Sequence, residues 1–299
     1  GLARIVFRSG NDVGMLTLSA SAAQVDDLVA MTESASLPDW QGPLPGLPEA
    51  DEGLVEVVFV GDIMLSRTVE ERMEVYGSRY PFEGVADLLR DADLTIGNLE
   101  VPFSLHGQPL SKRFVFRVDP MHADGLPWAG FDVVSLANNH LLDFGQEGLT
   151  RTLDRLGEVG VAYVGAGRSY PEAHRPLVWE GKGTRIAFLA YAATRWKGSH
   201  ELPTSELVSF ADLATIQEEV RRARDLADLV VVVLHLGTEY QVAPDQEQLA
   251  ASHAAIDAGA CLVVGHHSHV VQGWEEYGGG LIAYGLGNFV FDIDVVEAS

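Results

Sequence analysis

Short apolar runs rich in valine, isoleucine and leucine alternate with segments of helical spacing over most of this chain, from residue 55 onward. The run LVVVVL at residues 229–234 is apolar at every position, which is typical of a strand buried on both faces. Such strands need helices over their sheet, and the segments between them have the spacing that amphipathic helices require. The alternation therefore predicts an α/β protein built in layers.

The pattern predicts the position of each element. Strands are expected at residues 55–60, 94–96, 132–137, 161–164, 177–180, 185–190, 229–234 and 261–264. Helices are expected at residues 67–75, 82–90, 147–159, 210–227 and 245–258. The runs 270–277 and 281–284 flank three glycines, which favours an antiparallel hairpin. The sheets are therefore expected to be mixed.

Residues 1–53 do not continue the alternation of apolar runs and helical segments. A strand is expected at residues 3–8 and a helix at residues 21–31, and residues 37–53 carry four prolines among acidic residues. We interpret 1–53 as an N-terminal appendage with a Pro-rich linker and 54–299 as the main domain, which we expect to be incomplete at its C-terminus.

The composition excludes several classes of protein. Lys and Arg total 20 against 43 Asp and Glu, a formal charge of −23, which argues against nucleic acid and against an anionic membrane surface as partners. A local metal or arginine cluster would still allow an anionic substrate. The single cysteine, Cys261, rules out an internal disulfide framework and is expected to be an inert core thiol.

Polar side chains follow five of the predicted strands directly. In open α/β sheets ligands gather at the carboxyl ends of the strands, and most of these side chains are good ligands for a divalent metal. They are Asp62; Glu100; Asn138, Asn139 and His140, with Asp143 following; His235, with Glu239 following; and His266, His267 and His269. Each is weak evidence alone, because turns, caps and core histidines explain single cases. Their recurrence at one sheet edge favours a site assembled by folding.

His267 and His269 form the strongest single signal. Alternate residues of an extended segment point to opposite sides, so two such ligands need a turn between them. Gly265 and Ser268 make a turn plausible there.

The strand-end motifs together resemble those of the CapA family of capsule and poly-γ-glutamate synthesis proteins, over residues 55–292. The motifs that carry the resemblance are Gly61-Asp62-Ile63-Met64, Gly97-Asn98-Leu99-Glu100, Ala137-Asn138-Asn139-His140, His235-Leu236-Gly237-Thr238-Glu239-Tyr240, Gly265-His266-His267-Ser268-His269-Val270 and Gly287-Asn288-Phe289-Val290-Phe291-Asp292. That family in turn resembles calcineurin-like metallophosphatases. The resemblance implies a four-layer α/β/β/α sandwich with mixed sheets and a site for one or two divalent ions, Mn, Fe or Zn.

The resemblance also implies residue roles. Asp62 and His269 would bind the first metal, Glu100 would bridge, and Asn139, His235 and His267 would hold the second. His140 would be the general acid, oriented by Asp143. The third position of the first motif is His in the phosphatases but Met64 here, a soft thioether that is a poor ligand for these metals. This departure puts the first metal and ordinary phosphatase activity in doubt.

Further residues have two interpretations each. Lys112, Arg113 and Arg117 would either bind a substrate anion or form a salt-bridged strand edge. Glu239 and Tyr240 would either orient His235 and line the site or simply pack. His266 would either support the ligands or take no part.

Three functions remain open at this point. The first is a metal-dependent hydrolase acting on an anionic cell-envelope polymer such as poly-γ-glutamate, or on its linkage. The second is a non-catalytic polymer-binding or export and assembly subunit, and the third a general phosphoesterase. The resemblance further implies an extracytoplasmic protein, anchored by an N-terminal segment absent from this chain, with other capsule-synthesis membrane proteins as partners.

Overall fold

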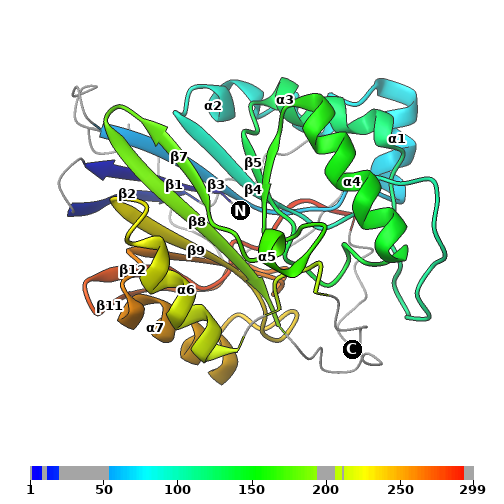
Figure 1. Ribbon diagram of the computed structural model, residues 1–299. Coiled ribbons are helices and arrows are strands. Elements are labelled where there is room, and N and C mark those ends of the chain that lie inside the picture. Colours follow the sequence, from blue (N-terminus) through cyan, green and yellow to red (C-terminus); the bar gives the residue numbers. More distant parts are fainter. Residues whose placement is uncertain (1, 9–11, 20–53, 194–205, 211, 293–299) are drawn as a thin grey trace.

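A computed structural model describes residues 2–8, 12–19, 54–193, 206–210 and 212–292 (Figure 1). Two mixed β-sheets lie face to face in the middle of the molecule, and helices cover their outer faces. The helices are α1 (Thr68–Tyr76), α2 (Ala86–Arg90), α3 (Gly125–Ala129), α4 (Gly145–Val159), α5 (Tyr170–Ala173), α6 (Leu213–Ala223) and α7 (Gln246–Ala258), with short 3-10 helices at Tyr80–Phe82 and Pro120–Asp124.

The first sheet has seven strands. Its order is β2 (Asp12–Ser19), β1 (Leu2–Arg8), β3 (Leu54–Ile63), β4 (Leu94–Leu99), β5 (Val133–Ser135) and β6 (Ala162–Val164), with β13 (Asn288–Val290) added beside the end of β3. Strands β3 to β6 and β13 run parallel, whereas β1 is antiparallel to both β2 and β3.

The second sheet has six strands. Its order is β11 (Trp274–Tyr277), β12 (Gly280–Ala283), β10 (Leu262–His266), β9 (Leu229–His235), β8 (Thr184–Ala192) and β7 (Leu177–Gly181). The inner four run parallel, and the two edge strands are antiparallel to their neighbours. The predicted hairpin is confirmed as β11 and β12, with Gly278 and Gly279 at φ of 59° and 85° in its turn.

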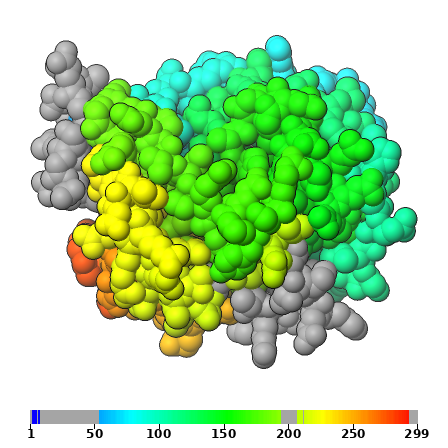
Figure 2. All heavy atoms as spheres, in the orientation of Figure 1, coloured from blue at the N-terminus to red at the C-terminus, as the bar shows by residue number. Residues whose placement is uncertain are grey.

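Three apolar clusters separate four layers. One lies between the sheets and includes Phe59, Phe188 and Val231. A second packs the first sheet against α1 to α4, and a third packs the second sheet against α6 and α7. The expected four-layer α/β/β/α sandwich with mixed sheets is thus confirmed. In Figure 2, α4 (green) and α6 (yellow) form separate parts of the outer surface.

The structure differs from the sequence expectation in several places. The helix expected at 82–90 is a 3-10 helix at Tyr80–Phe82 followed by the short α2, and strands β2 and β13 were not expected. Strand β1 was expected to belong to a separate appendage, but it pairs with β3 from Leu2↔Val60 to Arg8↔Leu54 and extends the first sheet. The helix at 21–31 and the Pro-rich stretch 37–53 lie outside the described residues. Helix α6 begins at Leu213 rather than 210 because Asp212 caps it, its side chain accepting from the Thr215 amide at 2.9 Å, and it ends at Ala223 rather than 227.

The topology brings five strand ends together. Strands β3, β4 and β5 of the first sheet run parallel to one another, as do β9 and β10 of the second, and β3 and β10 contact each other across the two sheets. Every polar motif found in the sequence follows one of these five strands.

Candidate metal centre

Asp62 lies at the carboxyl end of β3 and is fully buried. Its amide donates to the Gly287 carbonyl oxygen at 2.9 Å, just before β13. This approach requires glycine at position 61, because a Cβ there would lie 1.9 Å from the same oxygen. The Gly61-Asp62 pair is therefore not an ordinary turn: it lets β13 dock on β3 and holds the carboxylate in place.

The Asp62 carboxylate has polar partners from other strand ends. Asn98 Nδ2 donates to Oδ1 at 2.8 Å, and His266 Nδ1 lies 3.2 Å from the same oxygen. His269 Nδ1 is 3.3 Å from Oδ2. Burial alone would raise the pKa of Asp62, but hydrogen bonds from His266 and His269 outweigh it and hold the pKa well below its ordinary value. Asp62 is an ionised buried carboxylate.

Glu100, just after β4, is equally buried but differently surrounded. Neither of its carboxylate oxygens has a hydrogen-bond donor among the described residues. The nearest imidazole nitrogens to Oε1 are His235 Nε2 at 3.5 Å and His140 Nε2 at 3.9 Å. Burial, with the added charge of Asp62, raises the pKa of Glu100 well above its ordinary value. A buried carboxylate without donors is costly, and a bound cation would offset that cost.

Two of the imidazoles are held neutral. His235 ends β9, its Nε2 is 3.1 Å from Asn139 Oδ1, and burial lowers its pKa well below the ordinary value. Burial, together with the nearby His269, lowers the pKa of His267 to about 3. Neutral imidazole is the form that binds a metal ion.

His269 has the opposite shift. Burial would lower its pKa, but the carboxylates of Glu100 and Asp62 outweigh burial and raise it to about 10. Its Nδ1 is also 2.9 Å from Asn288 Oδ1, on β13. The charged imidazole thus pairs with the ionised Asp62 carboxylate.

The expected turn between His267 and His269 is present. Their φ angles are 83° and 57°, a region that non-glycine residues rarely adopt, and their ring centroids are 5.9 Å apart. Ser268 Oγ donates to the Val270 carbonyl oxygen at 2.7 Å within this turn. The unusual backbone turns both imidazoles toward Glu100.

The potential ligands form two groups that share Glu100. Asp62, Glu100 and His235 offer ligand atoms within 4.8 Å of one another, and so do Glu100, His267 and His269. Asn139 is half-buried beside His235. The pairs expected from the resemblance are also close together: His269 Nδ1 lies 3.3 Å from Asp62 Oδ2, and the ring centroids of His235 and His267 are 4.8 Å apart. Which ligands would share one ion therefore stays a prediction. The donor set of carboxylates and imidazoles fits a divalent ion, whose binding would displace the proton of His269.

His140 lies beside these groups. Its Nδ1 is 2.7 Å from Asp143 Oδ2, its Nε2 faces Glu100, and its ring stacks on Phe116 at a centroid distance of 4.1 Å. The Phe116 amide donates to the same Asp143 oxygen at 2.6 Å. Burial lowers the pKa of His140 below its ordinary value, although Asp143 opposes the shift. Asp143 therefore fixes the orientation of the His140 ring.

The three basic residues predicted as a cluster, Lys112, Arg113 and Arg117, have different surroundings in the structure. Lys112 forms an ion pair with Asp143 Oδ1, and its Nζ donates to the Asn139 carbonyl oxygen at 2.8 Å. The salt-bridge interpretation thus describes Lys112. The guanidinium groups of Arg113 and Arg117 lie over the rings of Phe114 and Phe144. Glu239 is exposed on the loop after β9.

The structure adds residues that the sequence alone left without a role. Asn98 is fully buried and contacts both Asp62 and, at 3.1 Å, His235 Nδ1. Asn138 donates to Asn98 Oδ1 at 3.2 Å and accepts from the His140 amide at 3.1 Å. Both lie inside recognised motifs, but spacing alone could not separate ligands from their supports. Met64 instead packs in the core between the first sheet and its helices.

A known protein family matches the part of the chain that contains these motifs. Residues 56–293 match the family model described as bacterial capsule synthesis protein PGA_cap. The chain belongs to this family. All of the metal-ligand candidates lie within the matched part of this PGA_cap chain, and residues 1–53 lie outside it.

Relatives of this PGA_cap chain include proteins with capsule-related names. It is 35% identical over 246 residues to the capsule biosynthesis protein CapA of Bacillus anthracis, covering 79% of this chain and 59% of that protein. It is 33% identical over 258 residues to the PGA biosynthesis protein CapA of Bacillus subtilis, covering 85% and 68%. A probable polyglutamine synthesis accessory protein of Mycobacterium tuberculosis is 31% identical over 268 residues, covering 84% and 70%. The chain thus spans only part of each relative.

Solved structures add little. A hypothetical protein from Thermus thermophilus has a TM-score of 0.49 at 21% identity, covering 77% of this chain and 75% of that one. A 5'-nucleotidase precursor from the same organism has a TM-score of 0.46 at 17% identity, covering 73% and 42%. These scores are too low to carry an inference about the site.

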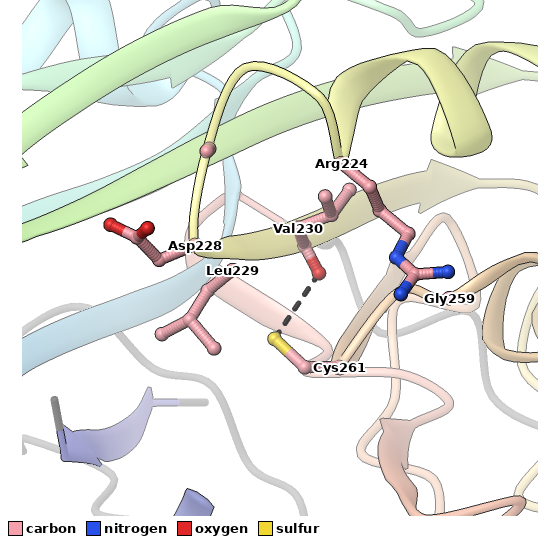
Figure 3. Close-up of a pocket in the computed structure, with 7 residues that line it drawn as sticks. Arg224, Asp228, Leu229, Val230, Gly259 and Cys261 are labelled. Carbon is pink, nitrogen blue, oxygen red and sulfur yellow. Dashed lines mark hydrogen bonds between the residues drawn. The ribbon is translucent and has the colours of Figure 1, made fainter. Parts of the chain in front are cut away.

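A cavity of about 450 Å³ lies elsewhere (Figure 3). Its lining includes Arg224, Asp228 and Cys261, near the amino ends of β9 and β10. The candidate metal ligands lie at the opposite, carboxyl ends of these strands, which we call the metal-ligand edge. Burial raises the pKa of the Cys261 thiol to about 12, and its Sγ donates to the Val230 carbonyl oxygen at 3.2 Å. The raised pKa keeps the thiol protonated, and Cys261 is only partly buried.

Among the described residues, no helix is both long and apolar enough to cross a membrane.

Proposed function

We propose that this PGA_cap protein is a metal-dependent hydrolase that acts on an anionic cell-envelope polymer such as poly-γ-glutamate, or on its linkage. The observation that carries the proposal is Glu100: a fully buried carboxylate without hydrogen-bond donors among the described residues, shared by two groups of potential metal ligands. A structural carboxylate would be expected to have donors.

The residues that would hold one or two divalent ions are Asp62, Glu100, Asn139, His235, His267 and His269. Mn, Fe and Zn all accept this mixture of carboxylate, amide and imidazole ligands. When bound, such ions activate water and stabilise negative charge on a reacting group.

The chain's own residues supply positioning and proton transfer. His140 Nε2 faces Glu100, so a proton can be taken up or released there, beside the ligands. Asp143 fixes the ring through Nδ1, and Lys112 and the Phe116 amide fix Asp143. Asn98 and Asn138 support Asp62, His235 and the start of the His140 turn.

The polymer part of the proposal is supported by the names of the relatives. A chain of formal charge −23 would repel a polyanion over most of its surface. Binding therefore needs local cations, and the proposed metal ions with nearby arginines supply them. We extend the proposal to an extracytoplasmic, membrane-anchored protein working with other capsule-synthesis membrane proteins.

The first test is metal content, measured by elemental analysis on protein purified without chelator. We expect one or two equivalents of Mn, Fe or Zn in the wild type, a loss of most of it in Glu100→Gln, and no change in Glu180→Gln, an exposed control on β7. Wild-type protein that stays free of metal after reconstitution would remove the hydrolase proposal.

A non-catalytic polymer-binding or assembly role is the second candidate. Met64 favours it, because the third position of the first motif is packed into the core and gives no ligand. Polymer affinity that persists in metal-free protein, together with no turnover of poly-γ-glutamate by metal-loaded protein, would favour this role. Rapid, metal-dependent hydrolysis of an aryl phosphate would instead revive a general phosphoesterase.

A further inference from the structure

Arg67 has a backbone conformation that side chains rarely adopt. Its φ and ψ are 59° and −130°, between the end of β3 and the start of α1. Such conformations are costly for any residue but glycine and gather at functional sites. Glycine would fit this position without strain, so the presence of arginine calls for an explanation in the side chain.

The end of the described chain holds Arg67 in place. Asp292 Oδ2 accepts from the Thr68 amide at 2.9 Å, and Oδ1 lies 3.5 Å from Arg67 Nε. The neighbouring Phe291 packs against the rings of Phe116 and His269, at centroid distances of 6.1 and 4.9 Å. Arg67 is therefore anchored by the segment that closes on the metal-ligand edge.

The Arg67 side chain lies beside Phe116, on the His140 side of the site. Its guanidinium carbon is 5.9 Å from the centroid of Phe116, the ring that stacks on His140. The positive charge of Arg67 also opposes the rise in the Tyr240 pKa that burial, Glu239 and Glu100 cause, and the Tyr240 ring lies 5.8 Å from that of His269. Arg67 remains 37% exposed, so an incoming molecule can reach it.

Lys112 is less accessible than Arg67 to an incoming anion. Its ammonium group is already engaged by Asp143 and by the Asn139 carbonyl oxygen, and its side chain is only 13% exposed. A guanidinium group also matches the planar fork of a carboxylate better than an ammonium group does.

We propose that Arg67 binds an anionic group of the substrate beside His140 and the metal ligands, and that its strained backbone is retained for this purpose. The inference rests on the proposed function and names the residue that recognises the polymer: for poly-γ-glutamate, the group is a side carboxylate next to the bond held at the site.

The test measures binding of a dye-labelled γ-linked glutamate oligomer to the full chain with Mn²⁺ present, by fluorescence anisotropy. We expect Arg67→Gln to weaken binding by about 10- to 100-fold, the usual range for losing a charge-assisted hydrogen bond. Arg79→Gln is the matched control, because Arg79 is also exposed and lies 5.1 Å over a ring, that of Trp128, and its loss changes the net charge equally. Arg67→Lys should retain part of the affinity. Unchanged binding in Arg67→Gln, or an equal loss in both Gln variants, would overturn the proposal.

A second variant separates binding from folding. Arg67→Gly relieves the backbone strain, so we expect the melting temperature to rise or stay level while oligomer affinity falls as in Arg67→Gln. A fall in both quantities would show that Arg67 is a structural residue only.

Failure of the polymer proposal gives a different pattern. If wild-type protein does not bind the oligomer, inorganic phosphate is the second probe, with thermal protection of the Mn²⁺-loaded protein as the readout. Protection that is present in the wild type and in Arg79→Gln but lost in Arg67→Gln would reject the polymer and keep the anion-binding role. Protection that is absent, or independent of Arg67, would overturn that role as well.

Discussion

His174 and Glu219 form a buried imidazole–carboxylate pair beside helix α6, much as His140, His235 and Glu100 do at the metal-ligand edge. In the α6 cluster each carboxylate oxygen has a donor: His174 Nδ1 is 3.0 Å from Glu219 Oε1, and the Tyr191 hydroxyl donates to Oε2 at 2.7 Å. Glu100, by contrast, is more deeply buried and has no donor among the described residues.

The difference distinguishes a polar cluster whose hydrogen bonds are made within the fold from one whose carboxylate is left without donors among the described residues. Glu219 joins α6 to β8 and to the end of α5, and its hydrogen bonds offset the cost of burial. No such compensation for Glu100 comes from the described part of the chain. A histidine near a carboxylate is thus weak evidence of function until the donors are examined.

Turnover gives the largest expected contrast between the two clusters. Changing His140→Ala should lower the rate of polymer cleavage by about 10²- to 10⁴-fold, the usual contribution of a general acid or base. His174→Ala should leave that rate nearly unchanged while lowering the melting temperature. Rates measured at equal metal loading would decide this, and equal losses in both variants would remove the distinction.

Replacing each carboxylate by leucine tests the comparison in metal-free protein. Glu219→Leu leaves the Tyr191 hydroxyl without its acceptor and His174 Nδ1 with only Ser209 Oγ, at 3.3 Å, so we expect it to lower the free energy of unfolding by about 1–3 kcal/mol. Glu100→Leu removes a carboxylate without donors, so that free energy should stay level or rise. Urea denaturation of both variants, with chelator present, measures the two effects. Destabilisation by Glu100→Leu as large as that by Glu219→Leu would contradict our interpretation of the site.

Added metal should change the stability ranking of one variant only. Glu100→Leu is expected to be at least as stable as the wild type without metal but less stable than the wild type with metal. With a divalent ion at about 100 times its dissociation constant, wild-type protein should gain about 2.7 kcal/mol of stability. Glu219→Leu should show the same gain, and Glu100→Leu little or none. Thermal unfolding with and without Mn²⁺ would show whether the gain follows Glu100.

The smallest effect is expected from Tyr191→Phe. It removes one hydrogen bond to Glu219 but leaves the ring packed, so the cost should be about 1 kcal/mol. Metal binding and turnover should not change. Any change in metal content would mean that the two clusters are coupled.

The sequence predicted much of this fold because its strands are buried on both faces. Runs such as residues 229–234 have no polar face, and the polar residue that ends each run marks the sheet edge where ligands meet. The antiparallel pairing of β1 with β3 could not be predicted, because a register between segments about fifty residues apart leaves no local pattern.

The sequence named the candidate site residues, but it could not predict which of their side chains contact one another. The spacing of Asn98, Asn138 and His266 shows that they lie near the strand ends, whereas their contacts to Asp62, His235 and His140 depend on side-chain directions. Lys112 shows the same limit: a cation in an acidic chain suggests a ligand for an anion, and only the fold reveals that the anion is Asp143.

The docking of β13 on Gly61 has a consequence for the order of events in the cell. The first ligand stands at position 62, yet its amide partner and the Asn288 contact to His269 come from residues more than two hundred positions later. During synthesis, Asp62 leaves the ribosome long before β13, so its amide cannot yet form the hydrogen bond to Gly287. A chain cut short before β13 would lack these two contacts, so the proposed metal site would be complete only after β13 has been synthesised.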